Sequence, residues 1–307
     1  MKNYSISREK VFFLDKTLQD IFLEEKLVLI DGGAAGGISA PFDVAENHVK
    51  AVRFEPRGKE TVSIESSDIF IDGGIWSEDV ELPLHIATGA SASSICKPNK
   101  AFLEGYDDRY GWPLRKTARI VDVKLRSIDS VVKNGEAPEP HFIKLDIHSA
   151  ELPALKGALH SLGRCIGVLV ESWHSEVHLQ QGLHCEVEKL LIDNGFTVYD
   201  NVCASRWRHK HANNISPADR PQYIGSEMLF IRESIPKDLA IKKIMILSLF
   251  GFGNAAKQVA EEHSDYLGKE KITRIIDTIS KYQERKLRSP RKLMAKVFRK
   301  ISTLLEK

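Results

Sequence analysis

The sequence predicts an α/β protein with a doubly wound, mostly parallel sheet, helices on both faces and a helical C-terminal extension. Three observations predict this fold. Short apolar runs without polar alternation, such as 27–30 and 142–145, are typical of strands buried on both faces. Segments with helical periodicity separate these runs. Beyond Pro236 the pattern is helical only.

The N-terminal elements follow from periodicity and turn residues. Apolar side chains recur at helical spacing over 8–25, which predicts an amphipathic helix. The first strand, 27–30, ends in a glycine-rich turn, and a helix over 38–48 leads to a second strand, 51–54. A third strand, 68–71, follows.

Residues 80–87 either extend the third strand or form a hairpin. The stretch 91–116 is irregular and rich in Ser, Pro, Gly, Tyr and Asp. Because long irregular insertions in compact domains are more often functional than not, we expect a substrate-side loop, with a plain surface excursion as the alternative. The remaining expected strands are 119–123, 142–145, 166–170, 196–200 and 227–231, and the remaining expected helices are 127–134, 150–162, 186–194 and 255–287.

These elements divide the chain into an N-terminal helix (1–26), a sheet domain (27–235) and a basic helical extension (236–307). Charged residues are distributed unevenly along the chain. Residues 281–307 contain ten Lys or Arg and two Glu, so this segment carries +8 and the remainder −6 of the net +2. An acidic body excludes a general nucleic-acid binder, whose body should itself be basic.

We expect a cytoplasmic protein, because residues 1–10 do not resemble a signal peptide and the longest apolar stretch, 244–252, is too short to span a bilayer. The four cysteines are widely separated, which favours reduced thiols over a zinc site.

The glycine-rich turn after the first strand indicates a ligand site. Without Cβ atoms, the backbone at Gly32, Gly33 and Gly37 can approach a ligand closely. Glu55 ends the second strand 18 residues after Gly37, where a carboxylate can accept both ribose hydroxyls of an adenosine. Together these residues predict an adenosine-containing cofactor.

The glycine pattern disfavours NAD. The dinucleotide motif Gly-x-Gly-x-x-Gly is broken, because Ala34 stands two positions after Gly32 and Ala35 stands two positions after Gly33. Asp31 also places a carboxylate at the mouth of the loop. This charge should repel a pyrophosphate and suit the ammonium and sulfonium groups of S-adenosylmethionine. An NAD-dependent oxidoreductase therefore remains the weaker alternative.

Several segments in order resemble signatures of the FkbM family of S-adenosylmethionine-dependent methyltransferases. They are Ile30 to Ser39 around the glycine-rich turn, Phe54-Glu55-Pro56, Ile143 to Ile147 with Glu151 and Leu155 to Ala158, Val170-Glu171, and Glu227 to Ile231. The resemblance spans roughly residues 27–232. It implies a Rossmann-like class I methyltransferase that acts on a hydroxyl of a sugar, a glycan or a related natural-product precursor. One departure is His148-Ser149, where the family usually has Glu-Gly.

The resemblance also implies residue roles. Asp31, Gly33 and Gly37 would line the methionine end of the cofactor, Glu55 would hold the ribose, and the 72–76 turn would border the adenine. The full implied cofactor set is Asp31, Gly32, Gly33, Ala34, Gly37, Glu55, Pro56, Asp72, Gly73, Gly74, Ile75, Trp76 and Asp146.

Methyl transfer from a sulfonium is an in-line displacement, so alignment supplies most of the acceleration. A base beside a sugar hydroxyl adds roughly 10²- to 10⁴-fold. Candidate catalytic bases near the carboxyl edge of the sheet are Asp146, His148 and His174. Imidazole titrates near neutral pH, which favours His148, although a structural role as a helix cap is the alternative.

Two further clusters have weaker support. Glu171, His174 and His178 could bind a divalent metal, but His-rich loops are more often solvated, so no metal site is predicted. The basic run 206–211 could bind an anionic substrate or lie in solvent. A non-catalytic scaffold that binds the cofactor or a glycan also remains open, because His148-Ser149 replaces the family's Glu-Gly.

The last segment predicts a basic amphipathic helix with Leu293, Met294, Val297, Phe298, Ile301, Leu304 and Leu305 on one stripe. Such a helix would dock on the anionic inner face of a membrane or on a partner enzyme. Alternatively, the stripe packs on the body or on a second subunit, which would make a homo-oligomer.

Deletion of residues 289–307 is expected to leave cofactor affinity unchanged and to alter vesicle binding or oligomeric state, because the deleted segment lies outside the family resemblance. Calorimetry, vesicle sedimentation and light scattering would measure the three properties. Loss of cofactor binding would contradict the prediction that this segment is not part of the cofactor site.

Overall fold

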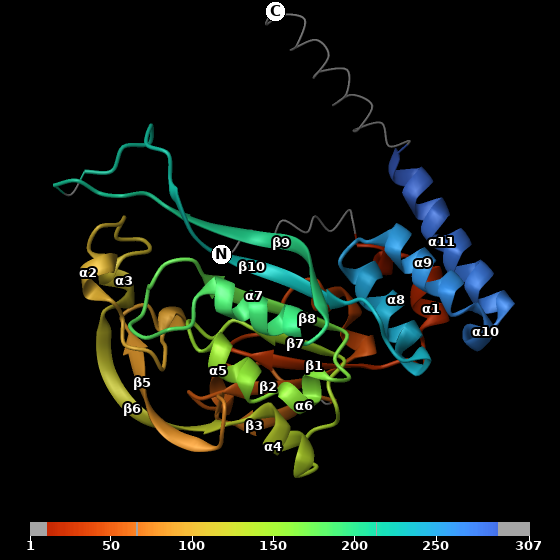
Figure 1. The fold of residues 1–307 in the computed structure, drawn as a ribbon, viewed down its shortest axis with the longest axis horizontal. Coiled ribbons are helices and arrows are strands. Elements are labelled where there is room, and N and C mark those ends of the chain that lie inside the picture. The colour runs from red at the N-terminus through yellow and green to blue at the C-terminus, as the bar shows by residue number, and fades with distance from the viewer. Residues whose placement is uncertain (1–10, 66, 213, 288–307) are drawn as a thin grey trace, which may run out of the picture. The chain divides into compact units, whose positions relative to one another are not determined.

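The chain forms two compact units (Figure 1). The structure, a computed structural model, describes residues 11–65, 67–212 and 214–287. Residues 26–235 group into the first unit by their contacts, and the described parts of 6–25 and 236–307 group into the second. Both sheets lie in the first unit, whereas the second unit is helical.

A seven-stranded sheet is the centre of the first unit. Its strands are β1 (Leu27–Gly32), β2 (Val49–Glu55), β3 (Ile69–Asp72), β7 (Phe142–Leu145), β8 (Gly167–Trp173), β9 (Phe196–Trp207) and β10 (Gln222–Arg232). Their order is β3-β2-β1-β7-β8-β10-β9, and β10 alone runs antiparallel to both of its neighbours. The predicted α/β class with a mostly parallel sheet is confirmed.

The hairpin of β9 and β10 is longer than the expected strands at 196–200 and 227–231. Its outer end extends well beyond the sheet in Figure 1. Polar residues dominate this extension, so the alternation that identifies a buried strand is weak there.

A second, three-stranded sheet contains β4 (Gly74–Ile75), β5 (Val80–Ala87) and β6 (Thr117–Arg126) in the order β4-β6-β5. Residues 80–87 neither extend β3 nor form a hairpin: β5 belongs to the second sheet and runs antiparallel to β6, from which residues 88–116 separate it. The segment between them is less irregular than expected. It contains the short helices α2 (Lys100–Leu103) and α3 (Trp112–Arg115), as well as a 3₁₀ turn (Ala90–Ala92).

Four helices pack their apolar residues with one face of the large sheet. They are α4 (Ile128–Lys133), α5 (Glu151–Lys156), α6 (Leu159–Leu162) and α7 (His184–Asp193). Val28 and Ile30 of β1 belong to this core, together with Ile143 and Leu145 of β7. The expected helix at 150–162 is divided between α5 and α6 at Gly157, where a Cβ would lie 2.2 Å from the Trp76 carbonyl oxygen.

The expected α-helix at 38–48 is replaced by a 3₁₀ helix, Phe42–His48. Pro41 lies inside the predicted span and has no backbone N–H, which disfavours a continuous helix through it. Phe42 packs on Phe142 with ring centroids 4.9 Å apart. Because successive residues of a strand face opposite sides, Phe142 lies on the face opposite the Ile143 core.

A buried ion cluster crosses the middle of that opposite face. The strand register places Asp31 beside both Arg53 and Lys144. Asp31 Oδ2 lies 3.2 Å from Arg53 Nε, and its Oδ1 lies 3.3 Å from Lys144 Nζ. Arg53 Nη2 also donates hydrogen bonds to the carbonyls of Ala34 (2.9 Å) and Gly36 (3.0 Å). The cluster therefore ties three strands to the glycine-rich turn.

The second unit brings together the two ends of the described chain. Its helices are α1 (Lys16–Ile21), α8 (Ala240–Leu249), α9 (Gly253–Glu262), α10 (Ser264–Leu267) and α11 (Lys269–Leu287), with 3₁₀ turns at Phe12–Leu14 and Lys237–Leu239. The single helix expected at 8–25 is interrupted at Asp15, whose side chain caps α1 by accepting from the Thr17 N–H at 3.0 Å. Arg285 of α11 pairs with the same carboxylate at 2.6 Å.

No helix in the described ranges is long and apolar enough to cross a bilayer. The basic amphipathic helix expected at the C-terminus lies outside the described residues.

Asp31→Asn is expected to lower the free energy of unfolding by about 3–5 kcal/mol, because it removes the anion that two buried cations share, and Arg53 keeps only the more distant Asp68 at 3.7 Å. Urea titration followed by circular dichroism would measure the change. Asp122→Asn, at an exposed position on β6, is the matched control and should stay within about 0.5 kcal/mol of wild type. Equal stability of the two variants would contradict the role of the ion cluster.

Candidate active site

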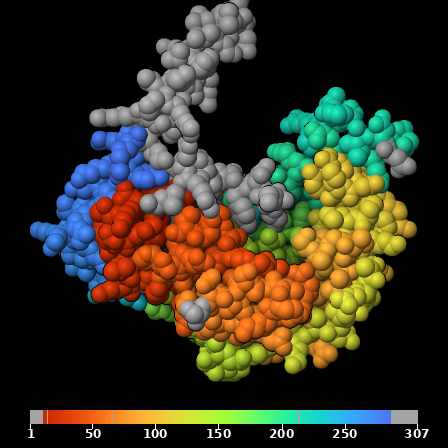
Figure 2. Space-filling model, turned by 180° about the vertical axis from the view of Figure 1, so that it is seen from behind, coloured from red at the N-terminus to blue at the C-terminus, as the bar shows by residue number. Residues whose placement is uncertain are grey.

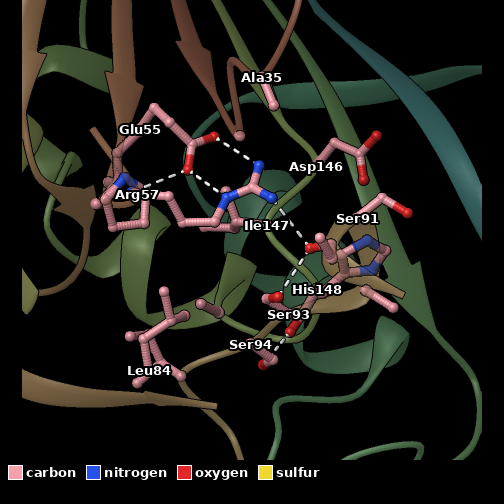
Figure 3. Close-up of a pocket in the computed structure, with 18 of the residues that line it drawn as sticks. Ala35, Glu55, Arg57, Leu84, Ser91, Ser93, Ser94, Asp146, Ile147 and His148 are labelled. Carbon is pink, nitrogen blue, oxygen red and sulfur yellow. Dashed lines mark hydrogen bonds and ion pairs between the residues drawn. The ribbon is translucent and has the colours of Figure 1, made fainter. Parts of the chain in front are cut away.

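A cavity of about 490 Å³ opens where β1, β2 and β7 end, between the large sheet and the small one (Figure 3). Its apolar lining includes Phe54, Ile75, Leu84, Leu114 and Leu125. Its polar lining comes from residues that are far apart in the sequence: Glu55, Arg57, Ser91, Ser93, Ser94, Arg115, Asp146 and His148. A space of this size, with an apolar lining and polar groups that converge on it, is typical of a site for a small molecule or cofactor.

The glycine-rich turn reaches this cavity through Gly33 and Ala35. Gly33 has φ +77°, and a Cβ there would lie 2.1 Å from the Asp146 carbonyl oxygen. Only glycine allows the end of β1 to pass this close to the end of β7. The backbone contact therefore sets the distance between the turn and Asp146.

Glu55 is buried at the end of β2 and is already engaged by an arginine. Arg57 Nε donates to Glu55 Oε1 at 2.8 Å, and Arg57 Nη2 donates to Oε2 at 3.2 Å. The Arg57 Nη1 group also donates to the Ala90 carbonyl at 3.1 Å. Figure 3 shows this pair on the side of the cavity opposite Asp146 and His148. A ligand that binds Glu55 must share its oxygens with Arg57 or displace that side chain.

Asp146 and His148 line the other side of the cavity, directly after β7. His148 has φ +50°, an uncommon value for a residue other than glycine, and its Nδ1 lies 3.1 Å from Glu171 Oε2. Glu171 is buried on β8. One ligand atom from each of these three residues lies within 4.8 Å of the others.

Hydrogen bonds hold this strained turn in place. Ser149 has φ +83°, and its hydroxyl donates to Gln181 Oε1 at 2.9 Å while contacting His178 Nδ1 at 2.7 Å. Ser94 Oγ donates to the His148 carbonyl. A left-handed backbone favours glycine, so Ser149 is kept there by partners that a glycine would lack.

Arg115, at the end of α3, brings a buried positive charge to the same region. Its guanidinium lies over the rings of Trp173 (5.3 Å) and Trp207 (5.0 Å), and its Nε donates to the Tyr110 carbonyl at 3.0 Å. Burial lowers the pKa of Arg115 to about 10, against the opposing influence of the carboxylates of Glu171 and Asp146. The side chain therefore remains protonated at neutral pH.

Two further buried acids surround the cluster. Glu227 of β10 is the direct cross-strand partner of Glu171, so the two side chains lie on the same face. Glu151 opens α5 and accepts a hydrogen bond from the Ile147 N–H at 3.0 Å. Burial raises the pKa of Glu151 to about 8, and the charges of Glu171 and Asp146 add to this effect.

The structure brings only part of the predicted residue set to the cavity. Those that line it are Gly33, Glu55, Pro56, Gly74, Ile75, Asp146 and His148. Those that do not line it are Asp31, Gly32, Ala34, Gly37, Asp72, Gly73, Trp76 and His174. Asp31 is turned to the other face of the sheet, where Arg53 and Lys144 neutralise it. Its charge therefore does not distinguish a sulfonium from a pyrophosphate, contrary to the argument from the sequence.

His174 lies away from the cavity and from the other candidate bases. Its Nε2 contacts Ser226 Oγ at 3.1 Å, and its ring packs on His184 and Tyr223. His178 is fully buried and faces Ser149, so His174, His178 and Glu171 are not gathered into the metal cluster weighed from the sequence.

The basic run at 206–211 lies at the outer part of the β9–β10 hairpin. Tyr106 forms a β-bridge with His209, and Tyr106 also packs on the His209 ring at 4.4 Å. Figure 2 shows this end of the hairpin, in teal, beside the yellow segment that contains residue 106. None of the six residues lines the cavity.

Three residues at the site were not identified from the sequence: Arg57, Arg115 and, as a neighbour of His148, Glu171. Arg57 directly follows the Glu55-Pro56 pair, and this closeness in sequence to Glu55 is the one indication that it belongs to the site. Arg115 comes from the long insertion, where nothing in its local sequence distinguishes it from other surface arginines.

The fold and the cavity define a class: an α/β protein with a ligand site at the carboxyl ends of its parallel strands, which is where such sheets bind ligands. The family comparison makes this specific. The model of the methyltransferase FkbM domain matches residues 47–198, a range that includes Glu55, Asp146, His148 and Glu171. Residues 47–198 thus match the methyltransferase FkbM domain, whose family uses S-adenosylmethionine. The glycine-rich turn and Glu227 lie outside the matched range.

Solved structures with similarity include a methyltransferase FkbM from Methylobacillus flagellatus KT, at 15% identity and a TM-score of 0.33. The match covers 67% of this chain but 43% of that protein, so the chain spans less than half of its length. Magnesium protoporphyrin IX methyltransferase from Synechocystis PCC 6803, solved with bound S-adenosylmethionine, is 8% identical with a TM-score of 0.30, covering 73% of this chain and 80% of that one. A comparison with curated proteins finds no match.

The residues present fit this cofactor. A buried carboxylate, Glu55, lies at the end of β2, where ribose hydroxyls need an acceptor. Pro56, Ile75 and Leu125 provide an apolar wall beside it, which suits an adenine ring. Asp146 lies across the cavity, next to Gly33.

The pKa of Glu151 predicts a specific pH dependence of stability. Because the folded state binds this proton more tightly than the unfolded state does, the contribution of Glu151 is fully present below about pH 4.5 and is lost as the pH rises through about 8. Glu151→Gln should flatten this decline while keeping an acceptor for the Ile147 N–H. Urea unfolding at several pH values between 5 and 9 would measure it.

The control for this comparison is Glu81→Gln, at an exposed position on β5, which should follow the wild-type profile. Parallel stability curves for wild type and Glu151→Gln would show that Glu151 is ionised in both states.

Proposed function

We propose that the protein methylates a hydroxyl group of a sugar, a glycan or a related natural-product precursor. The observation that carries this proposal is the position of Asp146 and His148 on the side of the cavity that faces Glu55, with Glu171 against the His148 ring. If Glu55 binds the ribose, the cofactor extends from that side toward Asp146. Groups that can take up a proton therefore lie where the acceptor would enter.

The chemistry requires alignment and removal of one proton. S-adenosylmethionine supplies a methyl group on a positively charged sulfur. The sulfur is a good leaving group, because it departs as a neutral thioether. A neutral hydroxyl is a weak nucleophile, and a base beside it adds roughly 10²- to 10⁴-fold. Among the described residues that line the cavity, His148 and Asp146 lie on the side facing Glu55, and we propose them for this role.

Glu171 supports His148 in that role. Its carboxylate oxygen lies 3.1 Å from Nδ1, so it offers a counter-charge to a ring that has taken up a proton. The left-handed backbone at His148 and Ser149, held by Ser94, Gln181 and His178, limits the orientations of the ring. A base held in one orientation needs less reorganisation when the acceptor binds.

The acceptor side of the cavity favours a polar, uncharged group. Ser91, Ser93 and Ser94 line it, and the acids near His148 would repel a strongly anionic acceptor. Serine hydroxyls both donate and accept hydrogen bonds, which suits a carbohydrate hydroxyl. The insertion 88–116, which supplies these serines and Arg115, is therefore the segment that we propose selects the acceptor.

Glu55→Ala is expected to weaken binding of S-adenosylmethionine by about 10- to 100-fold, equal to about 1.4–2.7 kcal/mol, because it removes charge-assisted hydrogen bonds to the ribose. Calorimetry with the cofactor and with S-adenosylhomocysteine would measure both affinities. Glu81→Ala, an exposed glutamate of the small sheet, serves as the control.

The same preparations would then be incubated with a panel of free sugars, nucleotide sugars and glycans, with methylation read by mass spectrometry. Unchanged cofactor affinity in Glu55→Ala would contradict the assignment of the cofactor site. Cofactor binding without methylation of any carbohydrate would contradict the proposed acceptor class.

A further inference from the structure

Three side chains that could coordinate a cation converge beside the cavity. Asp146 and His148 follow β7, and Glu171 comes from β8, the neighbouring strand. One carboxylate oxygen of each acid and one imidazole nitrogen lie within 4.8 Å of one another. Metal–ligand bonds of about 2.1 Å place two ligand atoms at most about 4.2 Å apart, so small side-chain rotations would close this set around one ion.

His148 and Glu171 approach each other inside this cluster. His148 Nδ1 and Glu171 Oε2 are 3.1 Å apart, and both atoms are buried. An unprotonated imidazole nitrogen and a carboxylate oxygen at this distance can bind the same cation, because two ligands of one ion lie roughly 3–4 Å apart.

The local charge also favours a cation. Asp146 and Glu171 belong to the cluster, and Glu227 lies directly across from Glu171 on β10. Arg115 is the buried cation whose charge acts on both Asp146 and Glu171. Three neighbouring acids against one arginine leave an excess of negative charge beside the cavity, which a divalent cation compensates most directly.

We propose that Asp146, His148 and Glu171 form a divalent-cation site at the acceptor end of the cavity, and that the cation takes two neighbouring oxygen atoms of the acceptor. The role of the cation in methyl transfer rests on the proposed function, whereas the cation site itself is defined by the three side chains alone. The proposed acceptor class becomes narrower: a vicinal diol, or a hydroxyl next to a carbonyl, can chelate one ion.

The donor set indicates which cations fit. Carboxylate oxygens suit Mg²⁺, Ca²⁺ and Mn²⁺, whereas an imidazole nitrogen favours transition metals and zinc. Two oxygen donors with one nitrogen donor therefore favour Mn²⁺, Fe²⁺ or Zn²⁺ over Mg²⁺ or Ca²⁺. Three protein ligands leave coordination positions open, as in catalytic rather than structural metal sites.

A cation here would activate the acceptor by coordination. The coordinated hydroxyl loses its proton to water, and an oxygen lone pair then forms the bond to the methyl carbon. The carbon–sulfur bond breaks at the same time, and its electron pair stays on sulfur as the neutral thioether. No oxidant or reductant is needed, and the positive charge of the sulfonium leaves the site as the released proton.

Arg115 has a place in this arrangement. Its Nη1 is buried and has no hydrogen-bond acceptor within the part of the chain that the structure describes. The residue lines the cavity together with Asp146 and His148. An acceptor oxygen that is held by the cation and becomes negative would provide the missing acceptor, so Arg115 would position it from a second direction.

The site can be tested without measuring catalysis. The full-length protein would be stripped of metal with EDTA, dialysed and titrated with Mn²⁺, with free Mn²⁺ read by electron paramagnetic resonance. Wild type is expected to bind one Mn²⁺ per chain. His148→Gln and Glu171→Gln should each weaken this binding at least about 10-fold, because each removes a ligand.

The matched control is His174→Gln, which removes a histidine that packs on His184 and Tyr223 outside the cluster. It should bind Mn²⁺ within about 2-fold of wild type. Circular dichroism would confirm that each variant is folded, and Asp146→Asn provides a further ligand variant should Glu171→Gln fail to fold. Absence of stoichiometric Mn²⁺ binding, or equal binding by wild type and His148→Gln, would overturn the proposal.

A second comparison separates this inference from the proposed function. Cofactor binding and methyl transfer would be measured with and without EDTA, followed by return of Mn²⁺. Loss of transfer in EDTA with cofactor affinity retained, and recovery with Mn²⁺, supports the cation site. Full transfer in EDTA overturns the cation's role and leaves His148 and Asp146 as bases, whereas failure to bind the cofactor at all would instead refute the proposed function.

Discussion

The ion cluster of Asp31, Arg53 and Lys144 is the constraint on which the site depends. It joins β2, β1 and β7 on one face of the sheet, and Arg53 extends it to the carbonyls of the glycine-rich turn. Arg53 is fully buried and also lies 3.7 Å from Asp68, just before β3. Because a buried charge is costly without partners, this network has few alternative arrangements. It thereby holds the turn against the end of β7, where Gly33 meets the Asp146 backbone.

The two faces of the large sheet thus differ in the kinds of buried residues that they carry. One face carries a continuous apolar core with α4 to α7, and the other carries the buried charges. Acids gather at the carboxyl ends of the parallel strands: Glu55 ends β2, Asp146 directly follows β7, and Glu171 lies two residues before the end of β8. The small sheet and the insertion 88–116 close the site, adding apolar side chains, serines and the buried Arg115. The cavity is therefore shared between the large sheet, which carries the acids, and the insertion, which supplies serines and Arg115.

Much of the fold could be predicted from local patterns. The apolar runs that became β1, β2, β7 and β8 identify buried strands, and Glu55, Asp146 and His148 stand directly after such runs. The same patterns were less informative where the chain depends on distant partners. The helix expected at 38–48 became a 3₁₀ helix after Pro41, and residues 80–87 could not be assigned until their pairing with β6 was known. Residues 11–25 and 236–287 belong to one unit although more than 200 positions separate them. No local sequence pattern predicts that these two segments pack together.

The sequence by itself determined the buried parallel strands, their order along the chain and the residues that follow them, because these depend on side chains a few positions apart. Tertiary structure alone decided which charges meet. Asp31, which stands at the mouth of a ligand loop in the sequence, is neutralised by Arg53 and Lys144 from neighbouring strands. Glu171, 23 positions beyond His148, lies against its ring, and Arg115 reaches the same acids from the insertion. Electrostatic interactions depend on distance in space, and only the register of the strands and the path of the insertion set those distances.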